Sequence, residues 1–296
     1  MHLNILKLFP DLLPFPGNDV SATILAWQGK QYGWTVHVDA LHEDAPWPQT
    51  SYDVILLGSS FTHIPSKLVQ SLNRLRLDLH AQIERGAVFL VSGISSCLMT
   101  ERSVLPNAGD DQDVSEIEGL SLIKGRSELI APVKSGWITV RSSFVSPLVV
   151  GELYRHCLLS VRSEEKGEPF GEIASAISFP ERLSRRLAQQ PSETFLKILK
   201  RKIFYDRKSA HEHPPAYDSN WRYFGWVRSY GHGQIIVLPW VGAYLSYNPH
   251  LVSWILSIVA NMHGEPLPET SIDTGFSWEA YHHIIKRIGL FEGTPD

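Results

Sequence analysis

The feature that most constrains this chain is a continuous apolar run, Ala87 to Val91, that breaks abruptly into Ser92-Gly93-Ile94-Ser95-Ser96-Cys97. Such a run, entered through Arg85-Gly86, predicts a strand buried on both faces. The small and polar residues after it are typical of a tight strand-to-helix turn. In α/β sheets, sites lie at the carboxyl ends of strands, and such a turn can hold a nucleophile clear of the sheet. The residue at the turn is Ser92.

The segments before this run alternate between apolar strands and helices. Further strands are expected over 3–9, 34–40 and 53–58, and helices over 18–31, starting at an Asn18 or Asp19 cap, and 65–84. This β-α-β-β-α-β order predicts an α/β fold, with a mostly parallel, flavodoxin-like sheet and helices on both faces.

The second half of the chain is less regular. Residues 101–119 are polar and acidic and predict an exposed loop, and short strands are expected over 120–123, 135–140 and 148–152. Strands over 221–227 and 234–238 flank Ser229-Tyr230-Gly231-His232-Gly233, a hairpin turn signal. Asn248-Pro249 is expected to cap a helix, and a last helix is expected over 277–288. We therefore predict one domain over 1–263, with a helical basic insertion near 180–208, and a linker with a C-terminal helix over 264–296.

Composition limits the class of protein. The chain has 296 residues, a net charge of −4 and two cysteines, Cys97 and Cys157. The acidic balance argues against a nucleic-acid-binding protein, and two cysteines provide neither a disulfide framework nor a zinc motif. The N-terminus lacks the layout of a signal peptide, and no apolar run is long enough to cross a bilayer. We expect a cytoplasmic protein without membrane association.

Candidate chemical groups gather near the predicted strand ends. Glu152, Tyr154 and His156 alternate along an extended segment, so they would share one face and could perform general acid–base work or bind a metal. The alternative is a strand edge whose polar side is solvated. Ser92 could act as a serine nucleophile with His63 or His156 as its base. The alternative is that Ser92 has no catalytic role and is simply a small residue that fits a tight turn.

Three other polar groups have simpler interpretations. The basic segment 180–208 could grip phosphates, but an amphipathic helix pair with a solvated basic face is favoured. His211 and His213, with Asp218, could chelate a metal, but the adjoining prolines favour an exposed linker. Asp110, Asp111 and Asp113 lack the spacing of a calcium loop. We therefore predict no metal and no cofactor.

Two parts of the sequence resemble branches of the class I glutamine-amidotransferase-like superfamily. Residues 224–262, with Tyr230-Gly231-His232-Gly233 between two strands and an Asn-Pro-led helix, resemble the closing segment of ThuA-like (trehalose-utilisation) proteins. Gly151-Glu152-Leu153-Tyr154 is similar to the Asp-Glu-Leu-Tyr stretch of that family. This resemblance implies a carbohydrate-modifying enzyme with Glu152, Tyr154 and His156 at its site.

The second branch is the amidotransferase domain of cobyric acid synthase and of the lipid II amidating complex. Phe9-Pro10-Asp11-Leu12-Leu13 and Glu118-Gly119-Leu120-Ser121-Leu122-Ile123 resemble segments of those enzymes. Gly242-Ala243-Tyr244-Leu245 resembles the Gly-Thr-Tyr-Leu before the family's catalytic His. The resemblance implies an amidotransferase-like three-layer core, a nucleophilic cysteine at the turn and a histidine that activates it.

This chain departs from the family at both catalytic positions. Ser92 stands at the nucleophile position and Ser246 where the histidine is expected, so glutamine hydrolysis by the family mechanism should fail. Cys97 lies more than one helical turn beyond the predicted turn. We therefore expect an amidotransferase-like pseudoenzyme that binds a small molecule, a sugar among the candidates, or a protein partner, as a subunit or scaffold. A homo-oligomer is one option. The alternatives are the ThuA-like carbohydrate enzyme and a serine hydrolase using Ser92.

Overall fold

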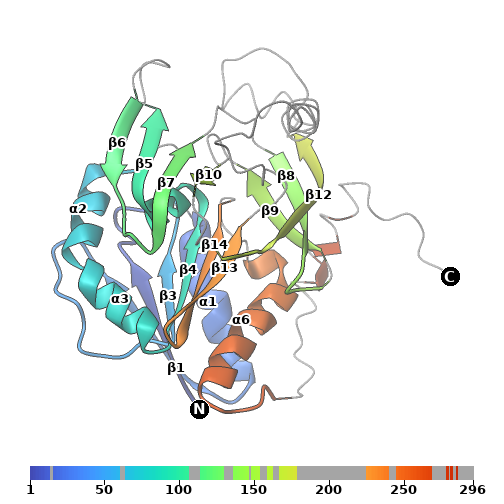
Figure 1. The fold of residues 1–296 in the computed structure, drawn as a ribbon. Coiled ribbons are helices and arrows are strands. Elements are labelled where there is room, and N and C mark those ends of the chain that lie inside the picture. The colour runs from blue at the N-terminus through green and yellow to red at the C-terminus, as the bar shows by residue number, and fades with distance from the viewer. Residues whose placement is uncertain are drawn as a thin grey trace.

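The computed structural model describes residues 1–13, 16–60, 64–106, 114–129, 136–146, 148–153, 159–162, 167–178, 225–239, 245–268, 278–279, 281–282 and 285. Its centre is a seven-stranded sheet in the order β11-β13-β14-β4-β3-β1-β2 (Figure 1). The strands are β1 (His2–Leu8), β2 (Thr35–Leu41), β3 (Val54–Leu57), β4 (Val88–Ser92), β11 (Glu168–Pro169), β13 (Trp226–Tyr230) and β14 (Gly233–Leu238).

Most of this sheet is parallel. Strands β2, β1, β3, β4 and β14 pair in parallel, whereas β13 and β11 continue the sheet in antiparallel pairs. The α/β class and the mostly parallel sheet predicted from the apolar runs are therefore confirmed. The predicted hairpin is also present, because β13 and β14 are joined by a two-residue turn in which Gly231 has a φ of 60°.

The parallel strands alternate their side chains between two apolar clusters. Val88 and Leu90 of β4 lie in a cluster with α1 (Pro16–Gln31) and α6 (Pro249–Met262). Phe89 and Val91 lie in a second cluster with α2 (Ser66–Arg74) and α3 (Arg76–Glu84). Figure 1 shows these two helix pairs apart from one another, with α2 and α3 at the left. Period-two alternation on a strand buried on both sides explains why the strands read as unbroken apolar runs.

The helix expected over 65–84 is two helices. Leu75 separates α2 from α3 with a φ of −100° and a ψ of 10°, outside the helical region. Its side chain is buried in the same cluster as Leu72 and Leu79. The break lets both helices keep their apolar sides on the sheet, and it leaves no mark in the spacing of apolar residues.

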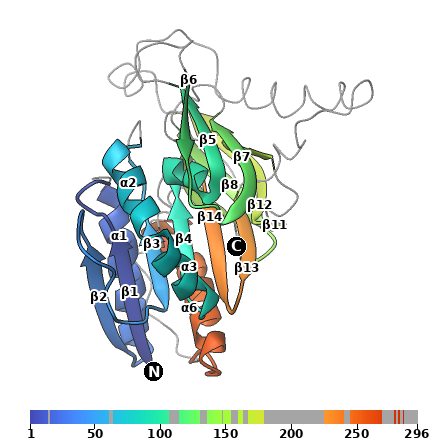
Figure 2. The same cartoon turned by 60° about the vertical axis from the view of Figure 1, so that its left-hand side comes forward.

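Two smaller sheets stand beyond the carboxyl ends of the parallel strands (Figures 1 and 2). One has the order β10-β7-β5-β6 and the other β12-β8-β9. Their strands are β5 (Thr100–Pro106), β6 (Val114–Glu118), β7 (Ile123–Leu129), β8 (Gly136–Ser142), β9 (Val149–Leu153), β10 (Leu159–Arg162) and β12 (Gly171–Ser178). The strands expected over 135–140 and 148–152 are thus present as β8 and β9, whereas the strand expected over 120–123 only begins at Ile123.

The prediction of an exposed loop over 101–119 is wrong for 101–106 and 114–118, which form β5 and β6, whereas residues 107–113 lie outside the described part of the chain. Of the described side chains of β5, Thr100, Ser103 and Val104 are buried, so hydroxyl groups make up much of its buried surface. Thr100, Ser103 and Ser127 have no exposed surface, and their hydroxyls bond to one another and to the carbonyl of Cys97. A strand satisfied in this way shows no apolar alternation, so the sequence pattern did not reveal it.

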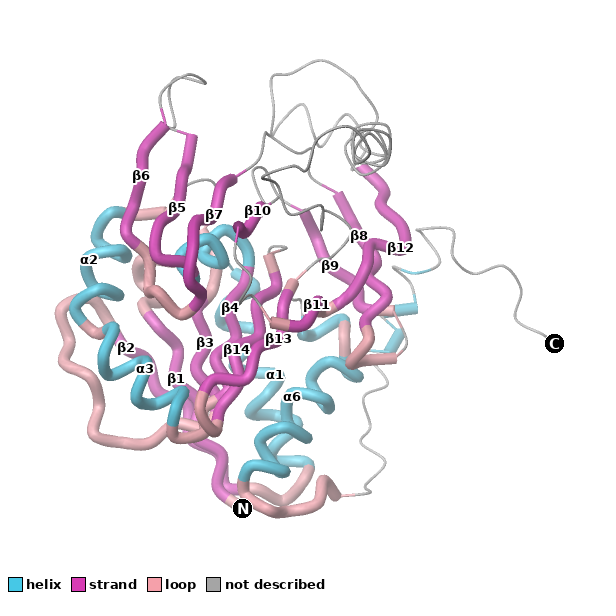
Figure 3. The backbone as a smooth tube through the Cα atoms, in the orientation of Figure 1, coloured by secondary structure: helices cyan, strands magenta, loops and turns pink. Residues whose placement is uncertain are grey.

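Most of the described residues after 244 are helical. Figure 3 shows α6 beside α1, and the two helices are in contact. Short 3-10 helices η1 (Gly93–Met99) and η2 (Leu245–Tyr247) precede β5 and α6. Residues 278–279, 281–282 and 285 are helical, within the helix expected over 277–288. Among the described helices, none combines the length and the apolar character needed to cross a membrane.

Asn248 stands at the N-cap position of α6, directly before Pro249, as expected, but its side chain makes no capping hydrogen bond. Its amide instead binds β9 in both directions, because the Val150 N–H donates to Oδ1 and Nδ2 donates to the Val150 carbonyl, each at 2.7 Å. The side chain therefore pairs with β9 as a neighbouring strand would, and it ties α6 to the β12-β8-β9 sheet.

Candidate functional site

The carboxyl ends of β1, β3 and β4 meet at a crevice beside the N-terminus of α1. The chain leaves β1 for β2 on one side and returns to β3 on the other. In open α/β sheets this change of direction leaves a crevice where ligands bind. The crevice is lined by Lys7 of β1, Gly58 after β3, Ser92 of β4 and Asn18 and Asp19 of α1. Its cavity volume of about 20 Å³ admits one water-sized group, so only one polar group of a ligand would enter it.

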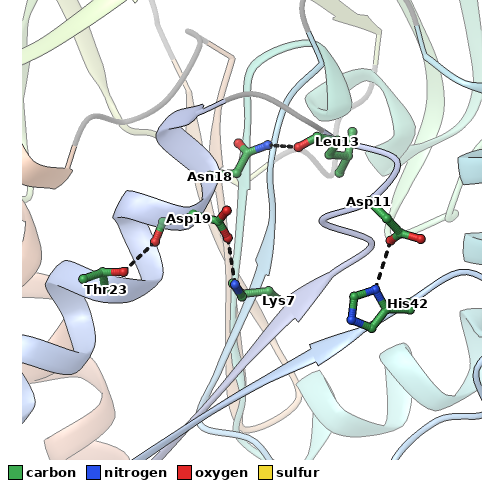
Figure 4. Close-up of polar contacts among 7 residues, drawn as sticks. All are labelled: Lys7, Asp11, Leu13, Asn18, Asp19, Thr23 and His42. Carbon is green, nitrogen blue, oxygen red and sulfur yellow. Dashed lines mark hydrogen bonds and ion pairs between the residues drawn. The ribbon is translucent and has the colours of Figure 1, made fainter.

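Asn18 holds the crevice in shape. Its Nδ2 donates to the carbonyls of Leu13 (2.7 Å) and Ser59 (2.9 Å), and its Oδ1 accepts from the Ser59 N–H (2.9 Å). Figure 4 shows this amide turned toward Leu13, away from the helix. Because α1 begins at Pro16, Asn18 lies inside the first turn and joins the loop after β1 to the end of β3, rather than capping the helix.

Gly58 is required by this arrangement. A Cβ atom at position 58 would overlap the amide group of Asn18. The amide thus occupies the space that any other residue would need. We infer that Asn18 and Gly58 form one structural unit at the crevice, although they lie far apart in the sequence.

Lys7 and Asp19 supply the charges of the crevice. Lys7 Nζ lies 2.7 Å from Asp19 Oδ1, with the two side chains 26% and 69% exposed (Figure 4). Asp19 lies in the first turn of α1, where a carboxylate is favoured by the helix dipole. A partly exposed pair of this kind adds at most about 1 kcal/mol to stability. The ion pair is therefore easily opened, and both charges are accessible to a ligand.

Ser92 lies at the crevice, as predicted, but not in the geometry of a nucleophile elbow. Its backbone is extended, with a φ of −127° and a ψ of 154°, and it is 9% exposed. The left-handed residue of the turn is the next one, Gly93, with a φ of 59°. A nucleophile elbow needs its strained conformation at the serine and a helix behind it. Here the strained position carries no side chain, and the 3-10 helix η1 follows.

Buried hydroxyls surround this turn. Ser59 Oγ accepts from the Ile94 N–H at 3.3 Å and donates to the Ser60 carbonyl at 2.9 Å. The hydroxyls of Ser95 and Ser96 are buried without a hydrogen-bond partner among the described residues. Buried hydroxyls without partners are unfavourable by about 1–3 kcal/mol each. The carboxyl end of β4 is therefore held in a conformation that its local hydrogen bonds do not fully stabilise.

Cys97 is not placed for catalysis. It is 1% exposed and packs in the apolar cluster that contains Leu98 and Met99. Cys157 lies outside the described residues. A thiol inside the core cannot meet a substrate at the crevice, so Cys97 does not replace a nucleophile at position 92.

The structure does not place the other predicted site residues relative to the crevice. His63, Tyr154 and His156 lie outside the described residues, as do the basic segment 180–208, His211, His213, Asp218 and the acidic residues at 110–113. Glu152 is described in its backbone only, within β9 opposite Trp137 of β8. Within the described part of the chain, no three His, Cys, Asp or Glu side chains gather as metal ligands.

A second polar cluster, which the sequence did not reveal, lies at the start of α6. The His250 ring stacks on Trp278 with centroids 5.5 Å apart and meets the edge of Tyr281 at 5.2 Å. Both ring nitrogens are buried and make no hydrogen bond of regular geometry with a described residue, although the Leu148 backbone lies close enough to interact with the ring. Burial lowers the pKa of His250 to about 4, against a smaller opposite effect of the Leu148 backbone. Burial likewise raises the pKa of Tyr281 to about 12.

Comparisons with known proteins do not identify a family. No family model and no curated protein matches the chain. The solved structures similar to it include the β-galactosidases of Bacillus circulans sp. alkalophilus (10% identity, TM-score 0.40) and of Rahnella sp. R3 (10%, 0.42). Another is the exo-β-1,4-mannosidase Op5Man5 from Opitutaceae bacterium strain TAV5 (12%, 0.34).

These alignments are one-sided. They cover 90%, 90% and 91% of this chain, but only 32%, 33% and 37% of the three structures in the same order. The chain thus spans about a third of the length of the proteins it is aligned with.

Proposed function

We propose that this chain is an amidotransferase-like protein without glutaminase activity, which binds a small polar ligand at the crevice between β1, β3 and β4. The observation that carries the proposal is the convergence of Lys7, Asp19 and Ser92 from three elements on that crevice. A cation, a carboxylate and a hydroxyl together suit a ligand with both hydrogen-bond donors and acceptors, such as an amino acid or a sugar. A protein partner that presents such a group is the other occupant.

The strand order supports the assignment to this superfamily. Strands β2, β1, β3, β4 and β14 follow the flavodoxin-like order 2-1-3-4-5. With α1 and α6 packed in one cluster and α2 and α3 in the other, this order is compatible with the three-layer core that the sequence resemblance implies. Fold alone does not define a function, so the absence of glutaminase activity depends on the catalytic positions.

The geometry after β4 supports the loss of glutamine hydrolysis. The left-handed position belongs to Gly93, Ser92 has ordinary extended backbone, and Cys97 is in the core. Nucleophilic catalysis needs an activated nucleophile within reach of a base. The serine-hydrolase alternative needs His63 or His156 as the base for Ser92, and both lie outside the described residues.

Ligand binding can be tested by thermal shift and calorimetry with a panel of amino acids, monosaccharides and small phosphates. A compound that stabilises the native chain should lose at least about tenfold in affinity when Lys7→Met removes the cation. Lys30→Met is the matched control, because Lys30 is exposed in the last turn of α1, at the opposite end of that helix from the crevice. No binding by any compound, or equal loss in both variants, would contradict the proposal.

Catalysis is tested on the same protein. Ammonia release from glutamine, or labelling of Ser92 by a fluorophosphonate, would overturn the assignment of a non-catalytic site. Turnover of a sugar that is abolished by His156→Ala would instead support the ThuA-like carbohydrate enzyme.

A further inference from the structure

The two edges of the main sheet differ in how well they are protected from other strands. At one edge, β11 has two residues, Glu168 and Pro169, and the proline lacks an N–H. Short edge strands and prolines prevent pairing with another chain. At the other edge, β2 has seven residues, pairs with β1 without a bulge and contains neither proline nor lysine.

The outer side of β2 is uncovered. All its residues are exposed except Val36, which is half-buried, and Leu41, which is buried. Val38 is 41% exposed and is one of four large apolar residues exposed in the described part of the chain. A long, exposed edge strand with an apolar centre is a template for another strand.

The backbone groups of β2 that face outward can be identified. The Thr35 N–H donates to the Met1 carbonyl, and the Leu41 carbonyl accepts from the Phe9 N–H. The odd-numbered residues of β2 therefore direct their N–H and C=O groups toward β1. Since these groups alternate along a strand, those of Val36, Val38 and Ala40 point away from the sheet, and they have no partner among the described residues.

We propose that β2 is a self-association surface, through which two copies of this chain pair antiparallel about a two-fold axis at Val38. In this register Val38 faces Val38 of the second copy and Val36 faces Ala40, so each outward N–H and C=O finds a partner. His37 then lies opposite Asp39 in a non-hydrogen-bonded pair, where side chains are closest.

Charge selects this register from its neighbours. A two-fold axis at His37 would place two histidines opposite each other, and an axis at Asp39 would place two carboxylates together. Two carboxylates directly opposite on neighbouring strands are destabilising, and an axis at His37 would leave both imidazoles without a carboxylate opposite them. The axis at Val38 instead sets His37 opposite Asp39 twice, with one Asp39 oxygen already accepting from the Tyr52 O–H at 3.0 Å, and places the apolar residue at the centre. Self-complementarity of this kind favours a second copy over an unrelated strand.

The faces of the sheet also match across the axis. Val36 packs with the cluster of α1 and α6, whereas Leu41 lies in the cluster of α2 and α3. A two-fold axis perpendicular to the sheet keeps each face on its own side, so the two sheets would join into one continuous sheet. The edge alone gives a small interface, and we expect a dissociation constant on the order of micromolar.

Sedimentation velocity of the full chain, from about 1 to about 200 µM, tests the proposal. We expect a monomer–dimer equilibrium for the native chain. The Val38→Asp variant should be a monomer, because it would place two carboxylates face to face at the axis. Leu77→Asp is the matched control, because it adds the same charge at a residue 80% exposed on α3, and it should dimerise normally. A native chain that stays monomeric, or a Val38→Asp variant that still dimerises, overturns the proposal.

A charge exchange tests the register. His37→Asp should weaken the dimer at least about tenfold, and the double variant with Asp39→His should recover it, because the opposed pair is restored in reverse. Hydrogen exchange adds a readout of the strand itself. The amides of Val36, Val38 and Ala40 should gain protection as concentration rises, while those of His37 and Asp39, bonded to β1, should be protected throughout. No recovery in the double variant, or no concentration dependence at the three outward amides, overturns the register.

Discussion

The two ends of α6 place one histidine at each end of the parallel sheet, in opposite environments. His263, which follows the last residue of α6, lies 2.7 Å from Asp53 Oδ1, and the second oxygen of Asp53 accepts from the Asn4 N–H. His250, at the start of the helix, is packed among rings and makes no hydrogen bond of regular geometry with a described residue. The negative end of the helix dipole lies at His263 and the positive end at His250, and burial lowers the pKa of His250 to about 4.

The same contrast holds for the sheet itself. At the amino end the carboxylate of Asp53 uses both of its oxygens. At the carboxyl end the hydroxyls of Ser95 and Ser96 find no hydrogen-bond partner among the described residues, and the Lys7–Asp19 pair is open to solvent. Unsatisfied groups cost stability, and natural proteins accept that cost at sites rather than at supporting edges. The amino end therefore stabilises the fold, and the carboxyl end is where binding is expected.

The largest effect should come from filling the space of Gly58. Gly58→Ala forces the Asn18 amide out of its three hydrogen bonds, and we expect a loss of about 3 kcal/mol in the free energy of unfolding. Urea denaturation measures it. The double variant Gly58→Ala/Asn18→Ala should lose clearly less than the sum of the single variants. Strict additivity would show that the two residues do not act as a unit.

The second-largest effect on stability should come from acid, through His250 at the carboxyl end of the sheet. The pKa of His250 is about 4 in the folded chain and about 6.5 when exposed, so the folded state resists protonation. Above pH 6.5 the lowered pKa of His250 does not reduce the free energy of unfolding. As the pH drops from 6.5 through 4, the free energy of unfolding falls by on the order of 2–3 kcal/mol. Urea denaturation at a series of pH values measures the fall. His250→Gln should flatten the curve over this range, and a curve unchanged by the substitution would assign the effect to other groups.

At the amino end, Asp53→Ala should cost about 2 kcal/mol, because it removes the acceptor of the Asn4 N–H and the partner of His263. Thermal denaturation gives the value. His263→Ala in the Asp53→Ala background should add little, whereas an additive loss would show that the two side chains are not coupled.

The smallest effect is expected from the same substitution at the carboxyl end. Asp19→Ala removes an exposed ion pair and should change stability by less than about 1 kcal/mol. It should nevertheless change ligand binding at the crevice as strongly as Lys7→Met does. A loss as large as that of Asp53→Ala would remove the distinction between the two ends of the sheet.

The sequence predicted the parts of the fold that depend on apolar patterning. The buried parallel strands and the hairpin at Gly231 were recognisable, because long apolar runs and turn glycines have few alternatives. Strand β5 was missed because much of its buried surface comes from Thr100 and Ser103, which are satisfied by hydroxyl hydrogen bonds. Such pairing depends on residues distant in sequence, and local composition does not reveal it.

The candidate site was predicted only in part, because most of its residues come together only through the fold. Ser92 was found from the turn after β4, and the structure places it at the crevice. Asn18 and Asp19 were expected only as a helix cap and Lys7 was not singled out, since a charge near a strand end and a polar residue near a helix start are ordinary. The available signal was a helix start near Pro16 together with the Gly58-Ser59-Ser60 turn, but only the fold shows that these two segments meet.

The interlock of Gly58 with the Asn18 amide has a consequence for natural variation. Two positions that share one volume cannot drift independently, so a larger residue at 58 requires a smaller one at 18. In an alignment of homologues that keep this fold, positions 18 and 58 should covary with each other more strongly than either covaries with its sequence neighbours. That statistical signature would mark the crevice even in chains whose charged residues have diverged.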